Sequence, residues 1–135
     1  DLASAIAARA AVTVAVGVGS PVGVVRVGDW VRELADRARP VAIHVVVNRA
    51  PTWRTGRAEI AREVRVDRRV SACTFVPADR RVEAAAWSGT VVERGPFARA
   101  IDGLWRDVAD AIVGQVGQVG QVGQVGQVGQ EVSAS

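Results

Sequence analysis

Lysine, methionine and tyrosine are absent from this 135-residue chain. All 17 basic side chains are therefore arginines, which stand against 14 acidic ones and give a formal net charge of +3. Without lysine the chain can supply neither the lysine of a phosphate-binding loop nor a Schiff-base nucleophile. Because it has no initiating methionine and opens at Asp1, we expect it to be part of a larger protein.

Cysteine, histidine and aromatic residues are scarce. Cys73 and His44 are the only residues of their types, which excludes an internal disulfide and leaves no set of zinc ligands. The apolar runs outside the C-terminal repeats are interrupted before the roughly 20 residues that a bilayer crossing needs. The first residues carry an acid and Arg9, which is the wrong layout for a secretory signal. These absences favour a cytoplasmic protein.

The C-terminus is a low-complexity segment. Six Val-Gly-Gln triplets occupy residues 113–130, and EVSAS follows them. Glycine at every third position is typical of collagen, but the triplets hold no proline and are few, so we expect a disordered tail over residues 113–135. Strand-like self-association and collagen-like assembly are the alternatives. The folded part is then a single domain, residues 1–112.

In the folded part, short β-branched runs alternate with longer helical patterns. Strands are predicted over residues 11–19, 41–48 and 69–77, and helices over 24–38, 56–67, 78–89 and 97–112. This alternation predicts an α/β fold: a partial doubly wound parallel sheet with flanking helices, in three α/β/α layers. The run at 11–19 has no polar alternation, so it is predicted to be a central strand buried on both faces.

The three strand ends, at residues 17–22, 48–52 and 77–80, are where chemistry is expected, because ligands bind at the carboxyl edge of parallel sheets. The first end is rich in glycine but matches no phosphate-binding motif, so a plain turn is expected there. At the second end, Asn48 offers the donor and the acceptor that a base edge requires. Alternatively, Asn48 only caps the strand and Arg49 is solvated. At the third end, Asp79 forms another wall of this pocket or caps a helix.

Several of these features follow one another in a recognisable order. A turn of small residues (VGVGSPVG) precedes an apolar strand that ends in Asn-Arg (VAIHVVVNRAP). A strand ending in Pro-x-Asp (FVPADRRV) and a closing amphipathic helix (GPFARAIDGLWRDVADAI) come next. In this order and spacing, residues 10–112 resemble the C-terminal half of the ParA/MinD family of deviant Walker A ATPases, including its CpaE-like branch.

The resemblance implies a P-loop NTPase-like fold in which Asn48 contacts the adenine of ATP, with Arg49, Pro77 and Asp79 as pocket neighbours. It also implies a nucleotide-dependent homodimer that serves chromosome partitioning or protein localisation. The family's phosphate loop and the aspartates that organise Mg²⁺ belong to its N-terminal half, which this chain lacks. We therefore do not expect the chain to hydrolyse ATP alone.

Other interpretations stay open. The resemblance implies non-specific DNA contact through basic residues, for which Arg54, Arg57, Arg68 and Arg69 are the candidates; a solvated arginine face is the alternative. The alternative to an ATPase fragment is that the chain is a degenerate, non-catalytic α/β interaction domain. Membrane attachment is not expected, because the helix at 97–112 mixes aspartates with its arginines.

His44, Cys73 and Trp53 are three further side chains with chemical potential. His44 and Cys73 both lie in the middle of predicted apolar strands, so both are expected to be structural. Trp53, in the loop after Asn48 and Arg49, is the one tryptophan considered for stacking on a base, and packing is the alternative.

Overall fold

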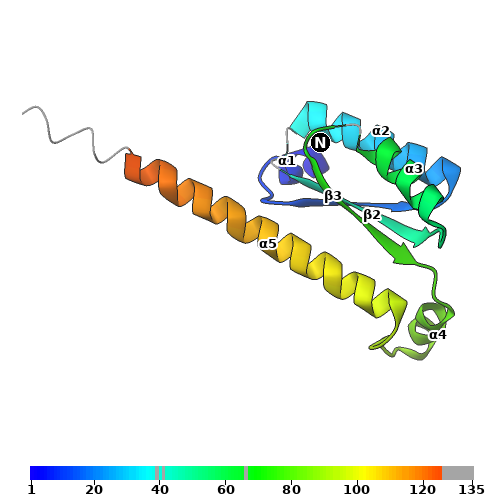
Figure 1. The fold of residues 1–135 in the computed structure, drawn as a ribbon. Coiled ribbons are helices and arrows are strands. Elements are labelled where there is room, and N and C mark those ends of the chain that lie inside the picture. Colours follow the sequence, from blue (N-terminus) through cyan, green and yellow to red (C-terminus); the bar gives the residue numbers. More distant parts are fainter. Residues whose placement is uncertain (39, 41, 66, 126–135) are drawn as a thin grey trace, which may run out of the picture.

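The computed structural model describes residues 1–38, 40, 42–65 and 67–125 and shows an α/β fold on a three-stranded parallel sheet (Figure 1). In chain order the elements are α1 (Leu2–Ala7), β1 (Thr13–Val18), α2 (Pro21–Ala38), β2 (Ile43–Ala50), α3 (Arg54–Val64), β3 (Val70–Pro77), α4 (Arg80–Ser88) and α5 (Pro96–Val125). Each predicted strand and helix is present, with ends shifted by a few residues except for α5, which is longer at its C-terminal end. The predicted α/β class is confirmed.

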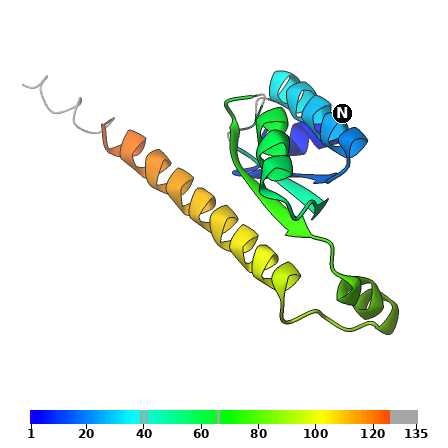
Figure 2. The ribbon, with the colours of Figure 1, turned by 45° about the vertical axis from the view of Figure 1, so that its right-hand side comes forward.

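The elements form three layers (Figures 1 and 2). The crossover helices α2 and α3 cover one face of the sheet, and α5 crosses the other face beneath β3. The strand order is β1-β2-β3, and all pairs are parallel. Because both crossovers use one face, the winding does not reverse within the strands that the structure describes.

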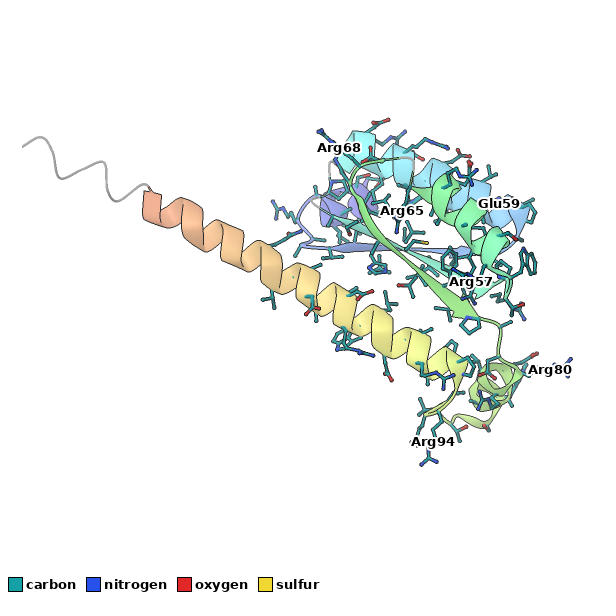
Figure 3. All side chains as sticks on the ribbon, in the orientation of Figure 1. Arg57, Glu59, Arg65, Arg68, Arg80 and Arg94 are labelled. Carbon is teal, nitrogen blue, oxygen red and sulfur yellow. The ribbon has the colours of Figure 1, made fainter. Side chains whose placement is uncertain are left out.

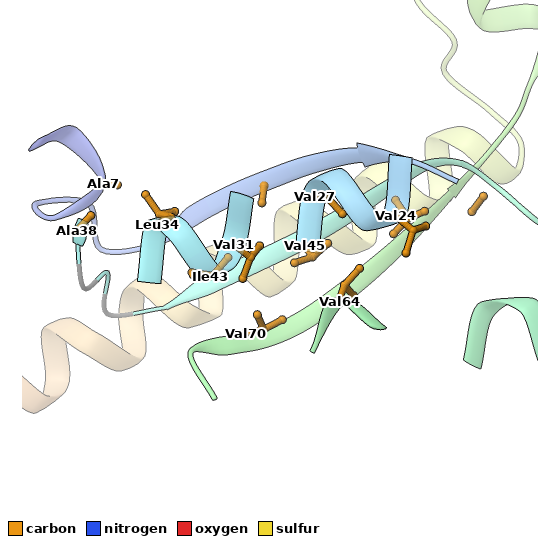
Figure 4. Packing of buried hydrophobic residues seen from close by; sticks show 13 residues of the cluster. Ala7, Val24, Val27, Val31, Leu34, Ala38, Ile43, Val45, Val64 and Val70 are labelled. Carbon is orange, nitrogen blue, oxygen red and sulfur yellow. The ribbon is translucent and has the colours of Figure 1, made fainter. Parts of the chain in front are cut away.

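The hydrophobic core lies between the sheet and the helices α2 and α3 (Figure 4). Alternate residues of β2, namely Ile43, Val45 and Val47, are fully buried on this face. They meet Val31 of α2 and Val64 of α3, which are fully buried as well. Burying one such side chain contributes about 2 kcal/mol relative to leaving it exposed, and these contacts attach α2 and α3 to the sheet.

The position of β1 contradicts the prediction of a central strand buried on both faces. The central strand is β2, and β1 lies at one edge of the sheet. On the face away from α2, Val14, Val16 and Val18 are 40%, 65% and 47% exposed. The apolar run does form a strand. It has the composition of an interior strand, but it lies at the edge of the sheet.

Helix α5 extends beyond the predicted helix at 97–112. It begins at Pro96 and continues through Val125, so the domain boundary predicted at residue 112 falls inside a helix. Pro96 suits the first turn of a helix, and the triplets hold no proline that would interrupt the hydrogen bonding that follows. Residues 126–135 of the predicted tail lie outside the described residues.

Only some of the apolar residues of α5 pack against the sheet. Leu104 and Val108 are partly buried on the side of the helix that packs on β3. Trp105, in contrast, is 73% exposed, and Ile101 and Ile112 are also exposed. The helix therefore has a second apolar stripe that the sheet does not cover.

Candidate functional site

The three strand ends meet at one edge of the sheet, as predicted for parallel strands. Asn48 of β2 lies between Val18 of β1 and Val76 of β3, and Ala50 lies beside Pro77. A hydrogen bond also joins the turn after β1 to the end of β2: the Gly19 N–H donates to the Asn48 carbonyl oxygen at 2.7 Å. We call this region, formed by residues 17–22, 48–52 and 77–80, the carboxyl edge.

Gly19 allows the turn after β1 to approach the end of β2 closely. A Cβ atom at this position would lie 2.8 Å from the Ala50 Cα and 2.8 Å from the Arg49 carbonyl oxygen. Ordinary contact begins near 3.4 Å, so no larger residue fits without separating the two segments. The glycine of the VGVGSPVG turn thus serves backbone packing.

Asn48 presents its amide at the end of the central strand, where it is exposed. Its Oδ1 accepts the Arg49 N–H at 2.9 Å, and the structure shows no partner for Nδ2 among the residues that it describes. By the alternation of β2, Asn48 shares the sheet face of His44 and Val46, opposite the core. The amide therefore keeps two donors and one acceptor lone pair for a ligand.

Arg49 has an unusual backbone. Its φ is +53°, which makes it the one non-glycine residue with positive φ within the described chain. The pairing of β2 with β3 is irregular between Asn48 and Ala50, so Arg49 forms a bulge and its side chain is exposed. Such conformations are costly outside glycine and cluster at functional sites. The strand β2 continues past the bulge to Ala50, which pairs with Pro77.

The N-terminus of α2 does not fit a phosphate group. Pro21 is the first residue of the helix and has no N–H, and the Gly23 N–H donates to the Ser20 Oγ at 3.1 Å. Two of the first three backbone positions are thus unable to bind an anion. The Ser-Pro pair is instead a helix cap followed by proline at the first helical position, which agrees with the plain turn expected from the sequence.

Asp79 lies at the carboxyl edge but is engaged by its own helix. Its carboxylate accepts the Arg81 N–H at 3.0 Å and so caps α4, as the sequence allowed. The Arg81 guanidinium donates to both carboxylate oxygens, at 3.0 and 2.7 Å. Hydrogen bonds from Arg81 hold the pKa of Asp79 below its usual value. Asp79 thus fixes the start of α4 and has little capacity left for a ligand.

The four arginines considered for DNA do not form one cluster (Figure 3). Arg54 and Arg57 stand at the start of α3, near the carboxyl edge, whereas Arg68 and Arg69 precede β3 at the opposite edge. Arg57 is also occupied: its Nε donates to the Pro51 carbonyl oxygen at 2.7 Å, and its guanidinium lies 5.6 Å from the Phe75 ring centroid. Arg69 pairs with Asp67 at 3.1 Å. Arg54 and Arg68 are exposed.

Trp53 packs at the start of α3. A Cβ atom on Gly56 would collide with the Trp53 indole, so the glycine provides the space for the ring. Trp53 is nevertheless 62% exposed, and it precedes Arg54 near the carboxyl edge. The indole is held by α3 on one side and is open to solvent elsewhere.

His44 is buried, whereas Cys73 is only partly buried. His44 is 2% exposed, and its Nε2 shares a 2.7 Å hydrogen bond with the Thr74 Oγ1. Burial lowers the pKa of His44, and the Asp107 carboxylate of α5 partly offsets this effect. Burial raises the pKa of the Cys73 thiol, against a smaller opposite effect of Arg65.

Over residues 1–38, 40, 42–65 and 67–125, no cluster of three or more histidine, cysteine or acidic side chains is placed to hold a metal ion. Within the same ranges, no helix combines the length and the apolar character needed to cross a bilayer.

Comparisons with protein-family models, curated proteins and solved structures gave no match to this chain.

Proposed function

We propose that this chain supplies the base-contacting part of an ATP site in a P-loop NTPase-like domain of the ParA/MinD/CpaE kind, which serves chromosome partitioning or protein localisation. The observation that carries the proposal is the exposed Asn48 amide at the end of the central strand. An adenine edge places a ring nitrogen acceptor beside an amino donor, and an amide side chain complements this pair. Arg49 follows the amide in the chain, Pro77 pairs with Ala50 at the same edge, and Asp79 caps α4.

The residues present fit the base of ATP but not its phosphates. The blocked N-terminus of α2 offers few backbone donors to an anion, and without lysine the chain has no phosphate-loop cation. ATP supplies a transferable phosphoryl group when bound. In the proposed arrangement, the other half of the domain binds the phosphates and Mg²⁺. This chain's residues bind and orient the base. The proposed working state is a nucleotide-dependent homodimer in the cytoplasm, where a lone thiol stays reduced.

The surroundings of β1 support a sheet that continues in the working protein. Among the described residues, no strand pairs with the outer edge of β1. A groove of about 580 Å³ runs beside this edge on the α2 side, with Trp30 and Arg26 in its wall. The other face exposes Val14, Val16 and Val18. Further strands with their own helix would cover both surfaces, and the carboxyl edge would then lie inside a larger sheet.

Competition against a fluorescent ATP analogue tests the proposal, with anisotropy as the readout. If the base carries the contact, adenosine displaces the analogue and tripolyphosphate does not. Asn48→Ala should weaken binding by about 5- to 100-fold, the worth of one amide–base pair. The matched control is Gln115→Ala, which removes an amide on α5. Displacement by tripolyphosphate alone, or equal affinity of Asn48→Ala and the wild type, would contradict the proposal.

The second candidate is a non-catalytic α/β interaction domain, with or without DNA contact. It is favoured by the exposure of Trp87 and Val91, at 88% and 83%, on and just after α4. Arg54 and Arg68 are the exposed members of the arginine set. Steep salt dependence of duplex DNA binding, lost in Arg54→Ala and Arg68→Ala, would support the DNA contact. Absence of binding at low salt would exclude it.

A further inference from the structure

The outer edge of β1 carries open backbone hydrogen-bonding groups. The N–H groups of Thr13 and Gly19 donate to the chain segment that holds β2, and the direction of these groups alternates from residue to residue along a strand. The positions between them that point outward are therefore the valines Val14, Val16 and Val18. Among the described residues, no strand pairs with this side of β1. The backbone groups of this edge are complementary to another extended chain.

The two edges of the sheet differ in how they are protected. Natural sheets block their edges against further pairing with charges, prolines, bulges or covering elements. The edge strand β3 has an irregular register at Ser71 and ends in Pro77, and α5 crosses beneath it (Figure 1). The sequence of β1, TVAVGV, holds neither a charge nor a proline, and its pairing with β2 is regular. Pairing is therefore blocked at β3 and open at β1.

A second copy of β1 fits this edge, and symmetry sets its direction. In a parallel ladder, a residue whose backbone points at the neighbour pairs with one that points away, as Thr13 does with Ile43. Two identical edges related by a two-fold axis cannot both meet this condition, whereas an antiparallel pair can. Centred on Val16, such a pair lets the two Val16 residues exchange N–H···O bonds. The Val18 N–H then faces the Val14 carbonyl oxygen of the other copy.

The side chains of the edge add apolar contact to this pairing. Val14, Val16 and Val18 all project from the face away from α2, and all are exposed. In the antiparallel pair, the valines of the two copies lie opposite one another on one face, where cross-strand pairs stabilise a sheet. On the other face, the groove of about 580 Å³ between this edge and α2, with Trp30 in its wall, gives room for the second copy. Since β1 is uncharged, no like charges meet along the strand.

We propose that the outer edge of β1 pairs antiparallel with β1 of a second copy, so that two three-stranded sheets become one continuous sheet. The contact is made by backbone groups and needs no nucleotide, so it does not depend on the proposed ATP site. The further strands of the proposed ATPase domain would use the same edge, and the two pairings exclude each other. Self-pairing is the state of this chain when those strands do not occupy the edge.

Analytical ultracentrifugation of the 135-residue chain over a range of concentrations, without nucleotide, tests the proposal. We expect a reversible monomer–dimer equilibrium. Val16→Glu places two carboxylates opposite each other at the two-fold axis and should weaken the dimer by about tenfold. The matched control is Val25→Glu, which changes an exposed valine on α2 outside the groove and should leave the equilibrium unchanged. A wild-type chain that is monomeric throughout, or an equal effect of the two variants, would overturn the proposal.

A mixture of two variants tests whether residue 16 faces itself. Val16→Lys alone should weaken the dimer as Val16→Glu does, because like charges again meet at the axis. An equimolar mixture of the two variants should form a mixed dimer more tightly than either variant dimerises alone. Circular dichroism checks that each variant is folded. If the mixture associates no better than the separate variants, the pairing centred on Val16 is wrong.

Amide hydrogen exchange, followed by NMR, distinguishes edge pairing from any other contact and uses the wild-type chain. The Val16 N–H points outward, so it should exchange about tenfold more slowly at a concentration where about nine-tenths of the chain is dimeric than in dilute solution. The Ala15 N–H, which points toward β2, is the internal control and should exchange equally at both concentrations. A dimer in which the Val16 N–H exchanges as fast as in the monomer would overturn the proposal.

Discussion

We predict that replacing Gly19 with alanine destabilises the fold, whereas replacing Gly28 with alanine stabilises it. At Gly19 an added Cβ would lie 2.8 Å from both the Ala50 Cα and the Arg49 carbonyl oxygen, about 0.6 Å inside ordinary contact. The Gly19 N–H bond to Asn48 holds the same segments together at 2.7 Å, so the clash falls on backbone that cannot rotate away. Overpacking of this kind costs about 1–3 kcal/mol. Gly19→Ala should therefore lower the free energy of unfolding by that amount.

Gly28 is the matched position. It is buried in α2, but a Cβ there would meet nothing closer than the Glu63 carbonyl oxygen at 3.8 Å. Alanine is favoured over glycine by about 1 kcal/mol inside a helix, so Gly28→Ala should stabilise the fold. Denaturant unfolding, followed by circular dichroism, compares the midpoints of the variants with that of the wild type. The reasoning is refuted if Gly19→Ala is as stable as the wild type, or if both variants lose stability alike.

Two further predictions use the single histidine and the single cysteine. Because burial lowers the pKa of His44, protonation favours the unfolded chain: stability is complete above pH 6.5 and falls as the pH drops below it, by up to about 1.4 kcal/mol per pH unit. His44→Gln should remove this slope in unfolding measurements, and an unchanged slope would show that another group is responsible. Because burial raises the pKa of Cys73, its reaction with a thiol reagent near neutral pH should be about tenfold slower in the folded than in the denatured chain. Equal rates would show that the thiol is open to solvent.

The order of strands and helices could be predicted because each element has a local signal. Pro21, Pro40 and Gly89 mark helix boundaries, and the β-branched runs around His44 and Cys73 have the length of strands. The capping role of Asp79 could be predicted for the same reason, since it depends on residues two positions away. Asn48 and Pro77 were placed at one edge because parallel strands share the direction of their ends.

Features that depend on distant neighbours could not be predicted. Nothing inside residues 11–19 distinguishes a central strand from an edge strand, because the difference lies in what pairs with it. Likewise, the sequence does not distinguish the partly buried Leu104 of α5 from the exposed Trp105, because the two residues are adjacent in the helix and both are apolar. The positive φ of Arg49 and the packing of Trp53 on Gly56 depend on backbone geometry that arginine and tryptophan do not signal. The Ser20 cap before Pro21 did have a signal, the Ser-Pro pair itself.

The contact between Asn48 and an adenine base can be measured directly, because Asn48 is the only asparagine of the chain. Labelling with [¹⁵N]asparagine gives a single side-chain NH₂ pair in the NMR spectrum. We predict that this pair shifts saturably on addition of adenosine or ATP and stays in place on addition of tripolyphosphate. An NH₂ pair that is unmoved by millimolar adenosine and ATP would contradict the assignment of the carboxyl edge to a nucleotide base.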